Sequence, residues 1–131
     1  MENQFGKYTL LKKLGDGGMA EVFLAEMKGP EGFSKRVAIK RILPHLSHDS
    51  VFTESFINEA RLGGYLNHHN IVQTLDFGQI DGFYYLAMEY VQGVDLRQVL
   101  QLAQQENEAL PLGIALDIAY QICEGLVYAL F

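Results

Sequence analysis

The sequence predicts an α+β fold: a five-stranded antiparallel sheet with one helix packed against it, followed by two further helices. Two hairpin signals support the sheet, a glycine-rich turn within residues 14–22 and the dipeptide Asp81-Gly82, each flanked by segments with strand character. Residues 51–66 carry a helical apolar face between the third and fourth strand segments. Two more stripes with 3.6-residue spacing follow residue 93.

Composition limits the function classes. The 131 residues, 49% of them hydrophobic, amount to one domain at most or to a piece of a larger one. A net charge of −6 argues against a nucleic-acid binder. The single cysteine, Cys123, excludes an internal disulfide and suits a reducing compartment. We see no secretory signal and no apolar stretch long enough to span a bilayer, and therefore expect a cytoplasmic chain without a membrane segment.

The strand segments are residues 8–14, 22–25, 36–42, 71–77 and 83–91. The first two flank the glycine turn, so this region is a strand–turn–strand hairpin. A dinucleotide fold needs a helix straight after its glycines and a Walker loop needs Gly-Lys-Ser/Thr, so the pattern excludes both. Unhindered N–H groups in the turn could bind anionic oxygens, while a plain tight hairpin uses glycine as well. At this point both interpretations stay open.

The third strand and the helix after it offer a pair of opposite charges. Alternation along residues 37–40 places the small Ala38 and the cationic Lys40 on one face of the strand. The helix, with capping residues at 47–50, carries Glu59 within an apolar face. A buried carboxylate is costly unless a cation meets it, and Lys40 is the natural candidate. The alternative is a solvated Glu59 at the rim of the face. That face consists of Phe52, Phe56, Glu59 and Gly63.

Two helices close the sequence. Asp95 can cap a helix along residues 96–103, and Pro111 fits the first turn of a last helix that runs to Phe131. This last helix is apolar on so many sides that it requires neighbours, of which the chain supplies few. We therefore expect a docking partner for it. The adjacent histidines at 68–69 have no Cys or acid at ligand spacing, so no metal site is predicted.

Taken together, the glycine hairpin, the Val-Ala-Ile-Lys strand and the acid within the helix resemble the N-terminal lobe of a eukaryotic-type protein kinase. The segment Leu-Gly-Asp-Gly-Gly-Met-Ala-Glu-Val at residues 14–22 is most similar to the corresponding segment of the bacterial Ser/Thr kinases. The resemblance covers residues 8–130. It implies an ATP-binding N-lobe over residues 1–92 and the truncated beginning of a C-lobe, with two helices, over residues 93–131.

The resemblance also implies roles for individual residues. Lys40 and Glu59 would be the catalytic ion pair that positions ATP. Met88 would be the gatekeeper, the Glu89 carbonyl and Val91 amide would bind adenine, and Asp95 would reach the ribose. The nucleotide-contacting positions that the resemblance implies are Leu14, Gly15, Asp16, Gly17, Gly18, Val22, Ala38, Lys40, Met88, Glu89, Val91 and Asp95.

The family's remaining motifs are expected beyond Phe131: the catalytic His-Arg-Asp loop and, further on, the Asp-Phe-Gly that holds magnesium. On this interpretation the sequence has neither motif. The expected cofactor is ATP, with Mg²⁺ only in an intact kinase, and protein Ser/Thr hydroxyls are substrates only if the missing lobe is supplied. The 131-residue chain alone is predicted to be inactive. The alternatives are a nucleotide-binding, pseudokinase-like lobe and an interaction module.

Overall fold

The computed structural model describes residues 3–131, apart from the side chain of Pro44. The described chain forms two compact units. The first comprises residues 3–67 and 72–90, and the second comprises residues 68–71 and 91–131. Each unit is described by itself below.

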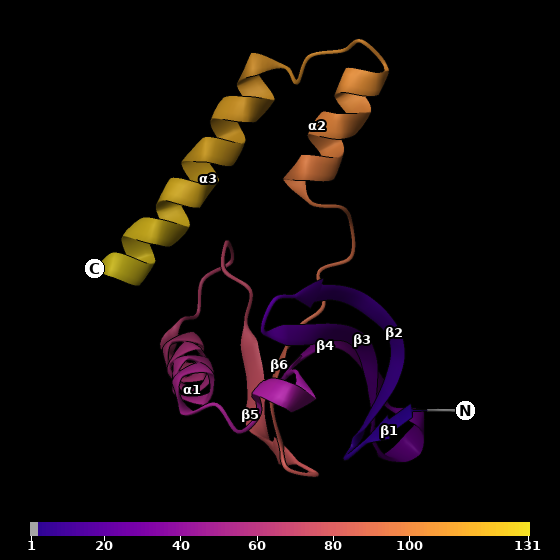
Figure 1. Cartoon of the computed structure of the whole chain (residues 1–131). Helices are drawn as coiled ribbons and strands as arrows, with labels where there is room; N and C mark the ends of the chain where they lie inside the picture. Colours follow the sequence, from indigo (N-terminus) through magenta and orange to yellow (C-terminus); the bar gives the residue numbers. More distant parts are fainter. Residues whose placement is uncertain (1–2) are drawn as a thin grey trace. The chain divides into compact units, whose positions relative to one another are not determined.

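The first unit is built on a curved antiparallel sheet of six strands in the described residues, in the order β1-β2-β3-β4-β6-β5 (Figure 1). The predicted antiparallel sheet is confirmed, with one strand more than the five predicted. The extra strand, β1, has three residues and pairs with the start of β2, too short for any alternating pattern to reveal. The strands are β1 (Asn3–Phe5), β2 (Tyr8–Gly17), β3 (Ala20–Lys28), β4 (Ser34–Ile42), β5 (Thr74–Ile80) and β6 (Phe83–Glu89).

Both predicted hairpins are present. In the first, β2 and β3 pair as far as Gly17 and Ala20, so the strands run through the glycines and leave a turn of Gly18 and Met19. In the second, Asp81 and Gly82 both have positive φ, 51° and 83°. That conformation matches the twist of the flanking strands, which is why Asp-Gly is favoured there.

Alternation on β4 separates two apolar clusters on opposite faces of the sheet. Val37 and Ile39 belong to the larger cluster, and Ile42 belongs to a smaller one beneath the helix. The larger cluster contains Phe5, Tyr8, Leu10, Phe23, Ala25, Val37, Ile39, Tyr85 and Ala87. The smaller cluster contains Ile42, Phe56, Ala60 and Leu86.

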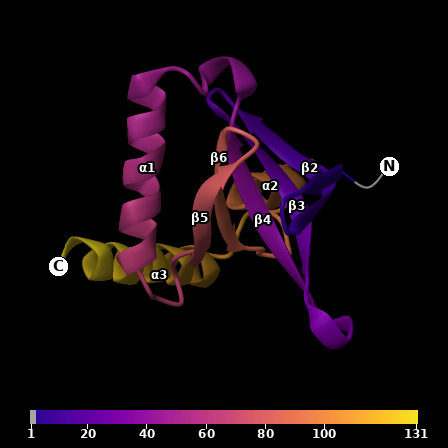
Figure 2. The same ribbon diagram turned by 90° about the horizontal axis from the view of Figure 1, so that it is seen from below.

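Helix α1 (Ser50–Tyr65) lies alongside β5 (Figure 2). Asp49 caps it, its carboxylate accepting hydrogen bonds from the backbone N–H groups of Val51 at 3.0 Å and Phe52 at 3.4 Å. Near the other end, Gly63 lets the helix approach the sheet, because a Cβ there would overlap Thr74 Oγ1. Short 3₁₀ turns at Pro30–Gly32 and Pro44–Leu46 flank β4.

The second unit contains α2 (Leu96–Gln105) and α3 (Leu112–Leu130). Asp95 caps α2 as predicted, in a capping box: its carboxylate accepts from Gln98 N at 2.8 Å, and Gln98 Oε1 accepts from Asp95 N at 3.0 Å. The segment 68–71 joins this unit because the Asn70 amide donates to the Gln121 carbonyl at 2.9 Å. The predicted strand over residues 71–77 therefore begins only at Thr74.

Helix α3 corrects the expectation that no stretch could span a membrane. It has 19 residues and a mean hydropathy of 1.3 over an 18-residue window, which suffices for a span by length and composition. The three polar residues Asp117, Gln121 and Glu124 interrupt the sequence but leave the average high. The core helix of a soluble protein can satisfy the same criteria, but such a helix is mostly buried, and only 6% of this window is buried in the described chain.

Candidate functional site

The two charges singled out in the sequence meet in the first unit. Lys40 Nζ on β4 lies 2.9 Å from Glu59 Oε1 and 3.1 Å from Glu59 Oε2 on α1. The Lys40 side chain is 28% exposed and that of Glu59 is 50% exposed. Glu59 is thus both paired and at the rim of the helix face. A partly exposed pair of this kind contributes about 0–1 kcal/mol to stability, so its importance is positional.

The ion pair borders a small cavity next to the glycine hairpin. Its volume is about 40 Å³, enough for a water molecule and far less than a nucleotide requires. The hairpin tip is tied to the end of β4 by a hydrogen bond from Leu43 N to Met19 O at 3.1 Å. The lining residues are Met19, Ala20, Lys40, Ile42, Phe52, Ser55, Phe56 and Glu59.

The loop glycines are not required by the conformation of the hairpin. None of Gly15, Gly17 and Gly18 has a positive φ, contrary to the usual reason for glycine in a turn. A Cβ at Gly15 or Gly18 would meet no described atom within 4 Å, and at Gly17 it would make an ordinary contact, 3.7 Å from Ala20 O. The backbone of the hairpin at Gly15 and Gly18 is therefore accessible to a ligand.

Four of the predicted nucleotide-contacting residues share one face of the sheet. Lys40 is paired with Val22 on β3, and Ala38 is paired with Met88 on β6. Directly opposite residues in antiparallel strands present their side chains to the same face. Since Ala38 and Lys40 alternate with Ile39, the face that carries the ion pair also carries these three apolar side chains.

The remaining predicted residues have other surroundings. Glu89 ends β6, where its N–H donates to Gln73 O at 2.9 Å and its carboxylate accepts from Gln73 N at 2.8 Å. Val91 and Asp95 belong to the second unit, and the Asp95 carboxylate caps α2. In the loop itself, Asp16 forms an ion pair with Lys13 at 2.7 Å, a contact that the sequence analysis missed.

The expectation that the sequence holds no Asp-Phe-Gly needs correction, because the tripeptide occurs at residues 76–78. The tripeptide lies in β5, ahead of Met88, Glu89 and Val91, the residues expected to contact adenine. The Asp76 carboxylate accepts hydrogen bonds from Tyr8 at 3.0 Å and Tyr85 at 2.8 Å, and lies 3.1 Å from Lys7 Nζ. This carboxylate is engaged by these partners on the face of the sheet opposite to Lys40, so it does not project toward that lysine.

The contacts of Asp76 with Tyr8, Tyr85 and Lys7 shift the pKa of this carboxyl group, and the pKa values of both tyrosines are shifted as well. Burial alone would raise the pKa of Asp76, but the hydrogen bonds from Tyr85, Lys7 and Tyr8 outweigh it and lower that pKa. Burial, together with the neighbouring carboxylate, raises the pKa of Tyr85 to about 12 and raises that of Tyr8 as well. Both tyrosines are therefore held in the protonated, hydrogen-bond-donating form.

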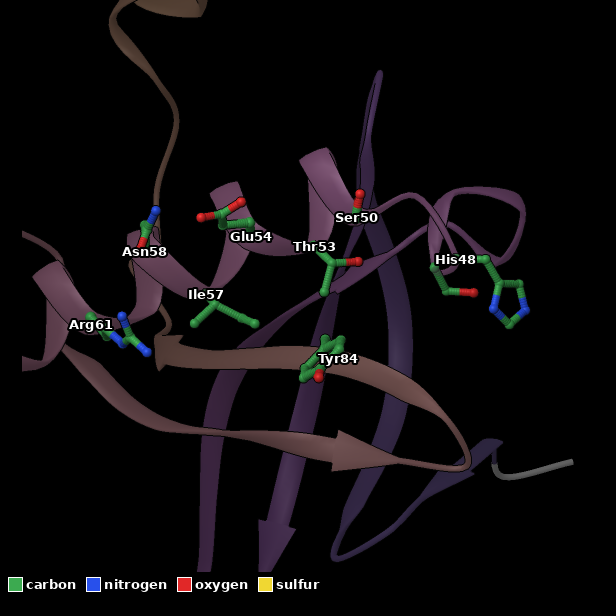
Figure 3. A pocket seen from close by; sticks show the side chains of 9 residues that line it. His48, Ser50, Thr53, Glu54, Ile57, Asn58, Arg61 and Tyr84 are labelled. Atoms are coloured by element: carbon green, nitrogen blue, oxygen red, sulfur yellow. The ribbon is translucent and has the colours of Figure 1, made fainter.

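A larger cavity of about 470 Å³ lies along another side of α1 (Figure 3). Tyr84 and Ile57 face each other across it, and the Thr53 hydroxyl is buried without a hydrogen-bond partner among the described residues. It shares no residue with the predicted site. Its lining residues are Ser47, His48, Ser50, Thr53, Glu54, Ile57, Asn58, Arg61 and Tyr84.

The sheet, its packed helix and the Lys–Glu pair define the class of this protein. A family model described as protein tyrosine and serine/threonine kinase matches residues 8–129. The chain belongs to the protein kinase family. It is 44% identical over 125 residues to the tyrosine-protein kinase MasK of Myxococcus xanthus, and 36% identical over 124 residues to the serine/threonine-protein kinase PrkC of Bacillus subtilis.

Solved structures agree with the sequence relatives. A crystal structure of the PknI kinase domain of Mycobacterium tuberculosis superposes with a TM-score of 0.76 at 33% identity, over 98% of this chain. The chain spans 49% of that kinase domain, 19% of MasK and 18% of PrkC, while 95% of it is covered in both sequence comparisons. The similarity therefore concerns the N-terminal part of a kinase domain.

Proposed function

We propose that this chain is the ATP-binding portion of a Ser/Thr protein kinase. The observation that carries the proposal is the two-point contact of Lys40 with Glu59, on the face that also bears Val22, Ala38 and Met88. A glycine hairpin whose backbone is open to a ligand adds to it. PrkC and PknI support the Ser/Thr assignment by their names, and MasK is named a tyrosine kinase, so hydroxyl specificity is part of the proposal.

Each element of the site has a physical role in this proposal. The Lys40 ammonium binds the α- and β-phosphates, and Glu59 holds that ammonium in place by accepting hydrogen bonds from it through both carboxylate oxygens. The hairpin N–H groups cover the phosphates, since no Cβ of Gly15 or Gly18 blocks the approach. Val22 and Ala38 offer a flat apolar surface to adenine. In a complete kinase, Mg²⁺ supplies neutralisation of the phosphate charge.

The isolated 131 residues are proposed to bind ATP without transferring its γ-phosphoryl group. Phosphoryl transfer in this family uses an aspartate to orient the substrate hydroxyl and acidic and amide side chains to hold the metal. The sequence contains no His-Arg-Asp tripeptide, and its Asp-Phe-Gly is engaged with Tyr8 and Tyr85. Autophosphorylation by the purified chain, lost in a Lys40→Met variant, would contradict this part of the proposal.

Substitution of Lys40 tests the nucleotide site directly. The change Lys40→Met keeps the length of the side chain and removes the charge that would contact phosphate. Lys35→Met is the matched control, because Lys35 is an exposed lysine on the same strand. Calorimetric titration with ATP and with adenosine should show that Lys40→Met loses the extra affinity for ATP while Lys35→Met keeps it. The proposal fails if the unaltered chain binds no ATP at millimolar concentration, or if Lys40→Met binds it equally well.

The exposed helix α3 favours a second function, that of an interaction module. Leu112 is 74% exposed, Leu116 is 60% exposed and Leu126 is 53% exposed. This candidate predicts association through α3 together with no measurable nucleotide binding. The titration above separates it from the first candidate.

A further inference from the structure

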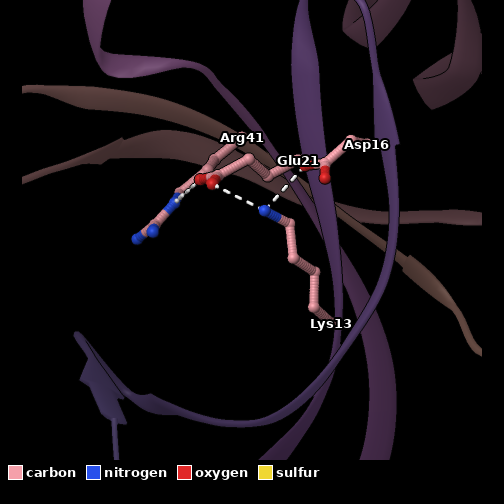
Figure 4. A network of polar contacts seen from close by, with 4 residues as sticks. All are labelled: Lys13, Asp16, Glu21 and Arg41. Carbon is pink, nitrogen blue, oxygen red and sulfur yellow. Dashed lines mark hydrogen bonds and ion pairs between the residues drawn. The ribbon is translucent and has the colours of Figure 1, made fainter.

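A chain of charged side chains connects the glycine hairpin to the strand that carries Lys40 (Figure 4). Its centre is Glu21 on β3. One carboxylate oxygen, Oε2, accepts from Arg41 Nε on β4 at 3.0 Å, and the other, Oε1, accepts from Lys13 Nζ on β2 at 3.2 Å. Lys13 in turn lies 2.7 Å from Asp16 Oδ1 in the hairpin. One carboxylate thus bridges three neighbouring strands.

Arg41 is a fixed anchor for this network. The centre of its guanidinium group lies 5.0 Å from the ring of Phe23, 5.3 Å from that of Phe5 and 5.8 Å from that of Phe83. These rings come from β3, β1 and β6, so the cation is enclosed by three strands besides its own. The side chains of Arg41 and Glu21 are only 21% and 15% exposed, which limits screening by solvent.

The network acts where the backbone pairing of the hairpin is irregular. The register of β2 against β3 shifts between Leu10 and Lys12 and again between Lys13 and Gly15. Such bulges interrupt the ladder and bend the strand. Lys13 lies between the two shifts, and its ammonium holds both Asp16 and Glu21. The ion pairs therefore fix the outer half of the hairpin at the place where backbone hydrogen bonds are displaced.

The network lies on the face of the sheet opposite to Lys40. Glu21 is paired with Arg41, and the next pair along the ladder is Val22 with Lys40. Because successive side chains point to opposite faces, Glu21 and Arg41 do not project toward a nucleotide bound beside Lys40. Any influence that they have on binding passes through the backbone of β3 and the hairpin.

We propose that Glu21 and Arg41 are positioning residues that, through Lys13, hold the glycine hairpin at a fixed height above Lys40. The inference rests on the proposed ATP site and names the residues that shape it from the far face of the sheet. It predicts that loss of the network weakens the contacts of the hairpin with phosphate and leaves the adenine surface unchanged.

The test compares ATP with adenosine as calorimetric probes of the 131-residue chain. Glu21→Gln and Lys13→Met should each lower the affinity for ATP about two- to fivefold, the factor that corresponds to a partly exposed ion pair, with adenosine affinity unchanged. Lys13→Arg, which keeps the positive charge, should bind ATP with the affinity of the unaltered chain. Glu26→Gln is the matched control, since Glu26 lies on the same strand outside the network and accepts a hydrogen bond from Ser34.

Two results would overturn the inference. One is an equal loss of ATP and adenosine affinity in Glu21→Gln, which would indicate a general weakening of the fold. The other is unchanged ATP affinity in both variants.

Amide hydrogen exchange of the ligand-free chain separates this inference from the proposed function. If the unaltered chain binds neither probe, the proposed function fails. Faster exchange at residues 15–20 in Glu21→Gln than in Glu26→Gln would then still show that the network holds the hairpin. Equal exchange in the two variants would refute that as well.

Discussion

At the scale of single residues, Asp76 shows how one carboxylate can join distant parts of a sheet. It receives hydrogen bonds from Tyr8 on β2 and from Tyr85 on β6, while itself lying on β5. Tyr8 is 1% exposed and Tyr85 is 5% exposed, and their rings lie edge to face, 5.6 Å apart. A buried hydroxyl without a partner costs about 1–3 kcal/mol, so this carboxylate is important to the whole cluster.

The pH dependence of stability follows from these groups. The pKa of Asp76 and that of Glu21 are lowered in the folded chain, so their contribution is present above the unfolded value near 4 and is lost as pH falls through the folded values. The pKa of Tyr85 is raised to about 12, so its contribution is present below the unfolded value of about 10 and is lost as pH rises toward 12. Thermal melting across pH should show a plateau between these limits.

An Asp76→Ala variant identifies the source of the acid limb. It should melt at a lower temperature at neutral pH and show a shallower loss of stability below pH 4, because one of the two titrating carboxylates is gone. Lys7→Met, which removes the 56%-exposed partner, is the control and should change stability by about 0–1 kcal/mol. An acid limb unchanged in Asp76→Ala would contradict this assignment.

Residue-level prediction from sequence succeeded where a regular period places the side chain. Alternation on the third strand and helical spacing on α1 made Lys40 and Glu59 candidates for an ion pair and left a solvated Glu59 open. The family resemblance favoured the pair, which the structure contains. The sequence could not decide between a buried Glu59 and one at the rim, since the rim of a helix face depends on the position of the sheet beneath it. The Glu21 network was missed because the two register shifts in β2 break the period that would have aligned Lys13 with its partners.

At the scale of elements, the contact of α1 with β5 depends on a glycine. In Gly63→Ala, the added methyl group would overlap Thr74 Oγ1 and lie 3.3 Å from Thr74 Cβ, so that Thr74 or the helix must move. The helix-propensity gain of about 1 kcal/mol should be outweighed by an overpacking cost of about 1–3 kcal/mol. Gly64→Ala is the matched control, because no described atom lies within 4 Å of its Cβ, and it should stabilise the chain. Urea unfolding of the two variants should shift in opposite directions.

A substitution in the glycine hairpin should, unlike Gly63→Ala, leave the fold stable and weaken ATP binding. Gly15→Ala adds a methyl group with no described atom within 4 Å, at a residue without positive φ. Its unfolding free energy should stay equal or rise by up to about 1 kcal/mol, since the unfolded chain loses freedom. Its affinity for ATP should fall severalfold while that for adenosine is kept. A destabilised variant with normal ATP affinity would show that Gly15 serves the fold.

Element bounds were predictable where a chemical signal marks them. Asp49 and Asp95 cap α1 and α2, and both caps are readable in the sequence. β5 starts three residues later than the sequence predicts, because Ile71 and Val72 have strand character while the segment 68–71 belongs to the second unit. That assignment depends on the contact of Asn70 with Gln121, 51 residues away, which no local pattern contains.

At the scale of the whole molecule, the apolar surface of the second unit should control behaviour in solution. Ile114, Ile122 and Val127 on α3 are each more than half exposed. An apolar surface of this kind promotes association. Light scattering should show species larger than a monomer at micromolar concentration, and Leu116→Gln with Ile122→Gln should reduce them. A monodisperse monomer of the unaltered chain would contradict the expectation.

The family match begins at residue 8, but the folded chain makes use of residues before it. Phe5 is 3% exposed and forms one wall of the enclosure around Arg41. Trimming the gene to the family boundary would discard that ring, whose burial is equivalent to about 1.5–3 kcal/mol, together with β1. An expression clone that starts at Tyr8 would thus open the guanidinium to water on one side and weaken the support that Arg41 gives to the glycine hairpin through Glu21 and Lys13.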